Sequence, residues 1–92
     1  MRQCYIITYD LVNPGRNYDA LLLRIKSYAG WAKLGGSSYL ILVDNKTSVQ
    51  IRDHLLEALD KNDTLYVGLM SNVAAWIGLG EDVSNWIRNN QK

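Results

Sequence analysis

The order of strand and helix patterns along the chain constrains its fold more than any other feature. Apolar runs rich in Ile, Val and Tyr are typical of strands, and they alternate with amphipathic stretches of helical period. Strand, helix, strand, strand, helix, strand is the order of the ferredoxin-like fold, so we predict an α+β protein with a βαββαβ antiparallel sheet and two helices on one face. The strands are expected at residues 3–10, 31–34, 38–44 and 64–70, and the helices at residues 18–29 and 48–59.

Short polar motifs mark the ends of these elements. Asn17 is expected to cap the first helix, and Gly30 is expected to stop it. Thr47 and Gln50 have the spacing of a capping box, which predicts the start of the second helix. Two glycines and a serine at residues 35–37 predict a hairpin turn between the second and third strands.

The 92 residues are expected to form one domain. Its ferredoxin-like core covers about residues 1–70, and a C-terminal extension covers about residues 71–92, with a short helix at residues 84–89. Residues 65–80 carry no charge, but this run is shorter than the roughly 20 residues that a membrane-spanning helix needs. No membrane segment is therefore expected.

The strands carry apolar side chains on both of their faces. Successive side chains of a strand point to opposite sides, so Tyr5 and Ile7 lie opposite Cys4 and Ile6. The third strand has the same two-sided pattern. Two helices can cover only one face of the sheet, so the other face needs a further partner. We predict a homodimer with stacked sheets; the alternative is that the C-terminal extension folds back over part of this face.

Composition restricts the classes of partner. Ten basic and nine acidic residues give a net charge of +1, which argues against strong non-specific binding of long duplex nucleic acid. This net charge does not exclude a short or single-stranded nucleic-acid ligand. Cys4 is the only cysteine, so no internal disulfide and no cysteine-based metal cluster is expected. A reducing, cytoplasmic setting is the natural expectation.

The first strand ends on a carboxylate. Asp10 follows an apolar run, and Asn13-Pro14-Gly15 then predicts a tight turn, so the acid is expected to be exposed at the end of the sheet. Two such acids, paired by the symmetry of a dimer, would suit one Mg²⁺ ion with waters. The other interpretation is a turn-forming Asp that accepts hydrogen bonds from the loop backbone.

Further polar residues follow Asp10. Asn13, Arg16 and Asn17 offer hydrogen-bond donors beside a helix N-terminus, where phosphate binds readily, and Arg16 can make a bidentate contact. An ordinary solvated turn is the alternative. Ser38 begins the third strand, and its hydroxyl would bind phosphate or position a water unless it is a plain turn serine.

The aromatic residues allow two interpretations. Tyr9, Trp31 and Tyr39 are candidates for stacking on bases, although such residues more often fill a core or an interface. His54 lies among charged residues of the second predicted helix, which indicates a solvated surface histidine.

Several segments resemble a known superfamily. Tyr5-Ile6-Ile7-Thr8-Tyr9-Asp10-Leu11 resembles the first strand of the CRISPR-associated protein 2 family, whose members end that strand in Tyr-Asp. The resemblance is closer to its superfamily relatives, virulence-associated protein D and the SinR-like small proteins. It extends over nearly the whole chain, through residues 9–18, 25–31, 38–40, 51–53, 60–65, 74–76 and 86–87.

This resemblance implies a ferredoxin-like homodimer with two Asp10 residues near its axis. It also implies metal-dependent RNase or DNase activity, as in some members, or a structural, DNA-bridging role, as in others. Arg16 alone stands where the CRISPR proteins often carry a basic run, and Ser38-Tyr39 loosely matches a Ser-aromatic pair of the family.

Two functional hypotheses follow. The first is a Mg-dependent endoribonuclease, a toxin or an antiviral defence protein, in which Asp10 of each subunit holds the metal and Arg16 and Ser38 orient the phosphate of single-stranded RNA. The second is a noncatalytic dimer with a cleft lined by Tyr9, Asn13, Arg16 and Trp31. That cleft would bind a nucleotide, a short oligonucleotide or a protein partner, as in a phage or host protein that sequesters signalling nucleotides.

Overall fold

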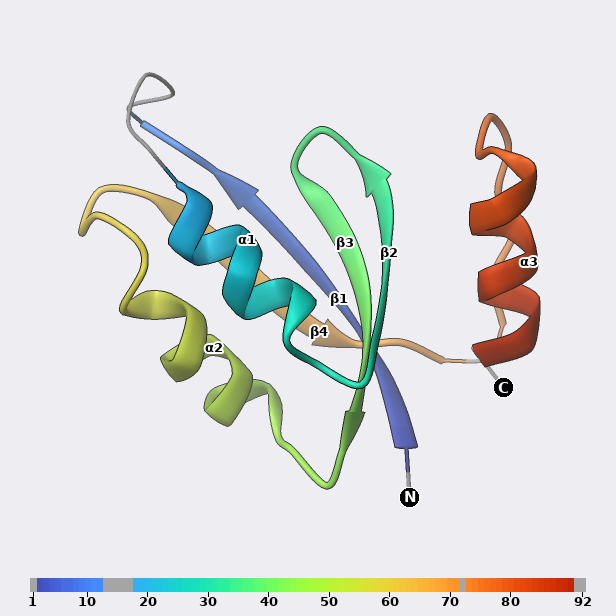
Figure 1. The fold of residues 1–92 in the computed structure, drawn as a ribbon, viewed down its shortest axis with the longest axis horizontal. Helices are drawn as coiled ribbons and strands as arrows, with labels where there is room; N and C mark the ends of the chain where they lie inside the picture. The colour runs from blue at the N-terminus through green and yellow to red at the C-terminus, as the bar shows by residue number, and fades with distance from the viewer. Residues whose placement is uncertain (1, 13–17, 72, 91–92) are drawn as a thin grey trace.

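The computed structural model describes residues 2–12, 18–71 and 73–90 of the chain. Within these ranges the predicted order of strands and helices is confirmed, and the C-terminal extension adds a third helix (Figure 1). No helix of these ranges is both long enough and apolar enough to cross a membrane. The elements are β1 (Arg2–Asp10), α1 (Asp19–Lys26), β2 (Gly30–Gly35), β3 (Ser38–Asp44), α2 (Ser48–Leu56), β4 (Thr64–Leu69) and α3 (Glu81–Asn90).

The four strands form one sheet in the order β2-β3-β1-β4. All three pairs of neighbours are antiparallel. Helices α1 and α2 lie side by side against one face of this sheet, while α3 stands beyond β2 (Figure 1). This architecture is compatible with the predicted ferredoxin-like fold.

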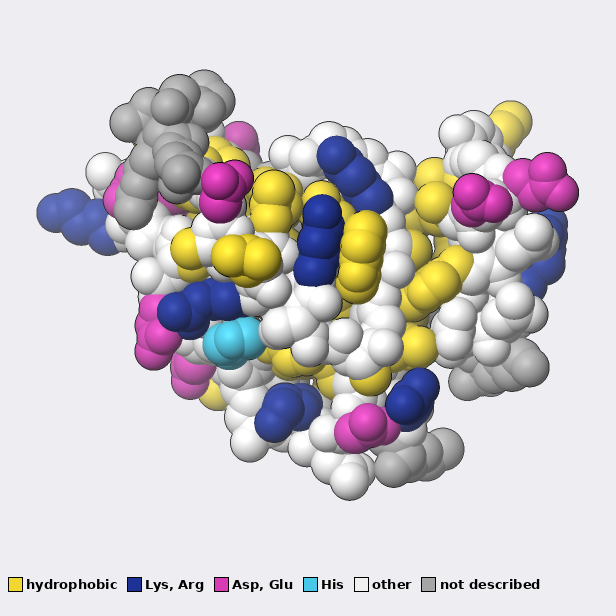
Figure 2. Space-filling view, viewed as in Figure 1, with side chains coloured by type: hydrophobic (Ala, Val, Ile, Leu, Met, Phe, Trp, Pro, Cys, Tyr) yellow, Lys and Arg dark blue, Asp and Glu magenta, His cyan; other side chains and the backbone are white. Residues whose placement is uncertain are grey.

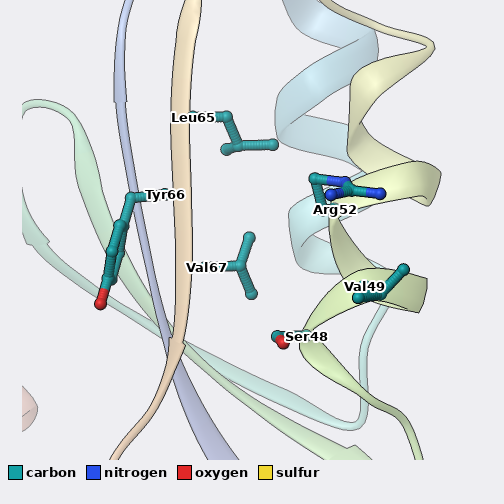
Figure 3. A pocket seen from close by; sticks show the side chains of 6 residues that line it. All are labelled: Ser48, Val49, Arg52, Leu65, Tyr66 and Val67. Carbon is teal, nitrogen blue, oxygen red and sulfur yellow. The ribbon is translucent and has the colours of Figure 1, made fainter.

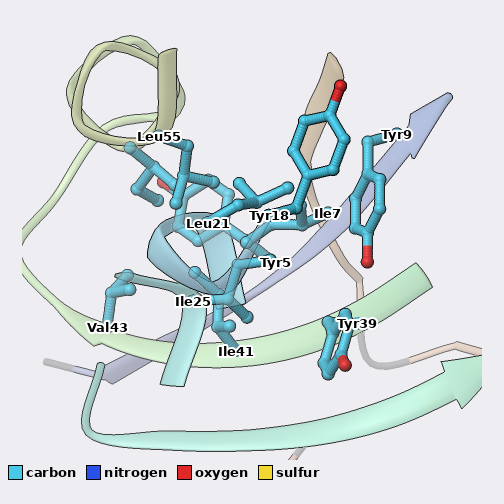
Figure 4. Close-up of a cluster of buried hydrophobic side chains, with 11 residues drawn as sticks. Tyr5, Ile7, Tyr9, Tyr18, Leu21, Ile25, Tyr39, Ile41, Val43 and Leu55 are labelled. Carbon is cyan, nitrogen blue, oxygen red and sulfur yellow. The ribbon is translucent and has the colours of Figure 1, made fainter. Parts of the chain in front are cut away.

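The face beneath α1 and α2 carries the main core, which we call the helix-covered face. Ile7 and Ile41 of the sheet, Leu21 of α1, and Ile51 and Leu55 of α2 are all completely buried (Figure 4). The alternation predicted for β1 and β3 is therefore confirmed on this side. Burial of a side chain of this kind stabilises the fold by about 1.5–3 kcal/mol relative to its exposure.

The opposite face of the sheet is covered only in part. Cys4, Leu40 and Leu42 form a second buried cluster with Ile87 of α3. The C-terminal extension therefore folds back over part of this face, as the alternative interpretation expected. The homodimer stays a prediction. Because α3 packs at the β2 side, the β1–β4 side of this face is left open.

The helix ends differ from the predictions at several points. The capping box is confirmed, with Thr47 Oγ1 accepting from the Gln50 amide at 3.1 Å and Gln50 Oε1 accepting from the Thr47 amide at 2.9 Å. The first helix was predicted too long, since it ends at Lys26 and the Ser27 hydroxyl donates to the Arg24 carbonyl.

Gly30 does not stop a helix but begins β2. A Cβ atom there would lie 3.0 Å from Leu42 Cδ1, so close packing of β2 on β3 explains this glycine. Helix α2 also ends three residues before the predicted limit, and α3 begins three residues before its predicted start. The predicted cap Asn17 lies outside the described residues.

Candidate functional site

Asp10 is the last residue of β1, and its side chain is exposed as predicted. It is paired across the sheet with Thr64 of β4. Since Tyr9 belongs to the helix-covered face, the alternation of the strand turns Asp10 to the opposite face. In the described parts of the chain no cation forms an ion pair with it.

Hydroxyl groups gather on the same side of the sheet as Asp10. Ser38 Oγ donates a hydrogen bond to Thr8 Oγ1 at 3.1 Å, and Thr8 is also paired with Tyr66 of β4. The Tyr66 side chain is 63% exposed. We call Thr8, Asp10, Ser38, Thr64 and Tyr66 the Asp10 surface. It thus brings together the two residues, Asp10 and Ser38, that were predicted to act in catalysis.

The orientation of β4 is visible at the groove between α2 and β4. Leu65 and Val67 point towards α2, whereas Tyr66 points away from it, onto the open side of the sheet (Figure 3). The groove has a volume of about 230 Å³, and on the α2 side it is lined by Ser48, Val49 and Arg52. The Tyr66 ring lies over Gly68, where a Cβ atom would be only 2.8 Å from the ring.

The donor set around Asp10 fits a metal ion only in part. Mg²⁺ prefers oxygen ligands and commonly takes one or two carboxylates together with waters. Asp10 and the hydroxyls of Thr8 and Ser38 are of the right chemical type. Nowhere in the described ranges, however, do three or more His, Cys, Asp or Glu side chains gather as a metal-binding group. One subunit therefore offers a single carboxylate here.

Sequence reasoning missed the structural role of Asp63. Its Oδ1 accepts from the Val12 amide at 2.9 Å, and its Oδ2 accepts from the Tyr18 hydroxyl at 3.0 Å and from the Asp60 amide at 2.9 Å. The local turn was predicted from residues 61–63, but nothing in the spacing indicated a contact to Val12, which lies 51 positions away. Asp63 joins the segment after β1 and the start of α1 to the turn before β4.

The predicted aromatic site residues lie on the wrong side of the sheet to share the Asp10 surface. Tyr9, Trp31 and Tyr39 belong to the helix-covered side, because Ile7 is paired with Tyr39 and Ile41 with Trp31. Tyr9 and Tyr39 are buried at one end of the main core (Figure 4). Burial, and to a lesser degree the nearby Tyr39, raises the pKa of the Tyr9 hydroxyl.

Trp31 differs from the two tyrosines because it is 40% exposed. Its ring lies 6.2 Å from that of Tyr39, and the Lys26 ammonium lies 4.7 Å from its centroid, within the range of a cation–π interaction. Lys33 lies two residues further along the same face of β2. Lys or Arg side chains lie beside exposed hydrophobic ones over β2 and the end of α1 (Figure 2).

The predicted ligand residues Asn13, Arg16 and Asn17 lie outside the described residues. His54 is exposed as predicted, yet its Nδ1 lies 2.7 Å from the Tyr28 hydroxyl. That contact joins α2 to the turn after α1, and no sequence pattern predicted it.

Comparisons with known proteins extend the description of the fold and go no further. No family model matches the chain, and no curated protein matches it. Among solved structures, a hypothetical protein from Thermus thermophilus is similar, with a TM-score of 0.68 and 21% sequence identity. The similarity covers 87% of this chain and 95% of that one. The chain therefore shares its fold with a protein that is itself described as hypothetical.

Proposed function

We propose that the protein is a homodimeric, Mg-dependent endoribonuclease whose site forms where two Asp10 surfaces meet. The observation that carries the proposal is the exposed Asp10 carboxylate, which lies on a part of the sheet that none of α1, α2 and α3 covers. In a two-fold interface each surface meets its own copy, so residues near the axis are paired with themselves. Two Asp10 carboxylates then supply what one subunit lacks.

The composition of the Asp10 surface supports an interface. Tyr66 presents a large, mostly exposed aromatic side chain, and tyrosine is enriched in protein–protein interfaces. Ile6, partly buried at the edge of the second cluster, continues the apolar area towards α3. Stacking two such surfaces would remove apolar area from water without separating α3 from its own sheet.

The chain's own groups suit phosphate recognition. Because the Ser38 hydroxyl donates to Thr8 Oγ1, the hydrogen of the Thr8 hydroxyl stays available to donate to a phosphate oxygen. In this proposal Ser38 fixes Thr8, and Thr8 takes the phosphate-binding role that was predicted for Ser38. The two Asp10 carboxylates would hold Mg²⁺, which when bound polarises phosphate and lowers the pKa of water.

The test compares cleavage of an unstructured single-stranded RNA by the wild type and by Asp10→Asn, with Mg²⁺ and with a chelator. Loss of a direct metal ligand should lower the rate by more than about a hundredfold. Asp53→Asn, an exposed acid of α2, is the matched control and should cleave like the wild type. Chelator-resistant cleavage that Asp10→Asn retains would overturn the proposal.

A second candidate function is noncatalytic binding of single-stranded RNA on the opposite side of the sheet. The exposed Trp31 ring beside Lys26 and Lys33 favours it, since base stacking combined with positive charge is how such strands are bound. Tryptophan fluorescence and RNA affinity of Trp31→Ala distinguish the two. A binder loses affinity with Trp31→Ala and keeps it with Asp10→Asn, and it leaves the RNA uncut.

A further inference from the structure

A separate cleft lies where the end of α1 faces the start of α2. It has a volume of about 370 Å³, which is within the range of small-molecule sites. Among the described residues that line it there is no carboxylate, and α2 has no acidic residue in its first turn. The residues that line the cleft are Ser27, Tyr28, Lys46, Gln50 and His54.

Acceptor atoms of Gln50 and Lys46 already accept hydrogen bonds within the fold, while the donor groups of the two side chains remain to bind a ligand. Gln50 Oε1 already accepts the Thr47 amide at 2.9 Å, so the Gln50 side chain has only its NH₂ group to offer a ligand. The Lys46 carbonyl accepts the Tyr5 hydroxyl at 2.8 Å, which fixes the backbone that carries the Lys46 ammonium. In the described residues that ammonium forms no ion pair.

The Tyr28–His54 pair adds a third donor in one tautomer of His54. The Tyr28 hydroxyl lies 2.7 Å from His54 Nδ1, with the two rings edge to face at 5.5 Å. Burial raises the pKa of the Tyr28 hydroxyl more than nearby Arg24 lowers it. The donor and acceptor roles in this contact depend on the His54 tautomer, and in the tautomer in which the Tyr28 hydroxyl donates to Nδ1 the imidazole hydrogen lies on Nε2.

Glu57, three positions after His54, is paired with a cation and is not among the described residues that line the cleft. Arg24 Nη1 lies 2.7 Å from the Glu57 carboxylate and also donates to the His54 carbonyl. Glu57 therefore has a cationic partner one turn beyond His54, and the same contact fixes the backbone of His54. The cleft is left with an ammonium, an amide NH₂ group and, in that tautomer, an imidazole N–H.

From this arrangement we propose that the α1–α2 cleft binds the phosphate group of a small ligand. Donors from Lys46 and Gln50, joined by the Nε2 hydrogen of His54 in that tautomer, match the oxygens of a phosphate, and no carboxylate competes among the described residues that line the cleft. Tyr28, which lines the cleft, gives it an aromatic wall, against which a nucleoside can rest. The site uses no residue of the Asp10 surface, so the proposal stands independently of nuclease activity.

The experiment titrates the full chain with inorganic phosphate, adenosine monophosphate and adenosine, followed by calorimetry. Gln50→Glu is the decisive variant, because a glutamate keeps the capping box yet replaces the NH₂ donor by a carboxylate. Lys46→Gln removes the cation. Their matched controls are Asn62→Asp and Lys61→Gln, which make the same charge changes in the turn at the other end of α2.

The wild type and both controls should bind phosphate and the monophosphate, whereas Gln50→Glu and Lys46→Gln should weaken both by about tenfold or more. Thermal unfolding should show that Gln50→Glu stays as stable as the wild type. Equal binding by Gln50→Glu, or adenosine binding as tightly as its monophosphate, would contradict the proposal. Binding of the monophosphate well above that of inorganic phosphate would identify a nucleotide as the ligand.

Discussion

The two faces of the sheet differ in how completely their side chains are buried. On the helix-covered face, Ile7, Leu21 and Ile51 are completely buried and belong to one cluster that joins the sheet to α1 and α2. On the other face, α3 covers the β2 side through Ile87, while the β1–β4 side ends in hydroxyls and a carboxylate. The first face can supply most of the stability, which leaves the second free to carry an exposed acid.

Because the two faces of the sheet differ in burial, we expect them to tolerate substitutions differently. Exposed positions outside a packed core usually change the free energy of unfolding by less than about 0.5 kcal/mol, whereas core positions cost several times more. A change on the Asp10 surface should therefore affect association or activity and leave folding intact. A change beneath α1 and α2 should do the reverse.

The largest expected effect is on the helix-covered face. Leu21→Ala should lower the free energy of unfolding by about 2–5 kcal/mol, because it leaves a cavity in a completely buried site. Ile87→Ala, at the 5% exposed contact of α3, should cost less because the helix can settle into the gap. Urea unfolding measures both. Equal losses would break the distinction between the two faces.

The next effect concerns Asp63, which joins the segment after β1 to the turn before β4. Asp63→Ala removes the acceptor of three hydrogen bonds and should lower the free energy of unfolding by about 2 kcal/mol. Asp63→Asn keeps one oxygen acceptor and should lose less. If both variants unfold like the wild type, these hydrogen bonds contribute nothing to the free energy of unfolding.

A smaller effect is expected at the start of α2. Thr47→Ala removes the side-chain acceptor of the capping box and should lower the free energy of unfolding by about 1 kcal/mol. Self-association measured by sedimentation should not change, since Thr47 caps α2, on the helix-covered side of the sheet, and is not part of the Asp10 surface. An altered association constant would show that the two faces are coupled.

Self-association itself is tested on the open face. Tyr66→Lys places a charge on the Asp10 surface and should shift the protein to monomer, while Trp31→Lys, on the other side of the sheet, should leave the dimer intact. Sedimentation equilibrium at micromolar concentration measures both masses. A monomeric wild type would remove the interface from the proposal.

The effect that is smallest at neutral pH is the dependence of stability on the titration of Cys4, beneath α3. Burial raises the pKa of the Cys4 thiol from 9.0 to about 11. Between these values the unfolded chain loses the proton and the folded chain keeps it, so the free energy of unfolding falls as pH rises through this window. Cys4→Ala should show a shallower fall in urea titrations across the same range. Parallel curves would contradict the expected burial of the thiol.

Local patterns predicted much of this structure, and long-range pairing decided the rest. The capping box at Thr47 and the alternation in β1 depend on neighbours within a few residues, so the sequence contains them fully. The exposed Asp10 was predictable for the same reason. Which aromatic residues share its face depends on the register of β1, β3 and β2, and that register joins residues far apart in the chain.

Gly30 and Asp63 illustrate the same limit. A glycine after an amphipathic stretch predicts a helix stop, but here its small size matters for a contact with Leu42 of another strand. Asp63 stands in an ordinary turn sequence, but its structural role depends on a hydrogen bond from the Val12 amide, 51 positions away. Residues of this kind are understood only once the strands are in place.

Because Cys4 lies beneath α3, the reactivity of its thiol can serve as a probe of local opening of the C-terminal extension. In the segment that leads to α3, Val73 and Ile77 are almost fully exposed, so the extension is held to the sheet by other apolar side chains, among them Leu79 and Ile87. Regions with few buried contacts open locally at a much lower free energy than the whole domain. The rate at which a thiol reagent modifies Cys4 therefore reports how often this extension detaches, before any strand unpairs.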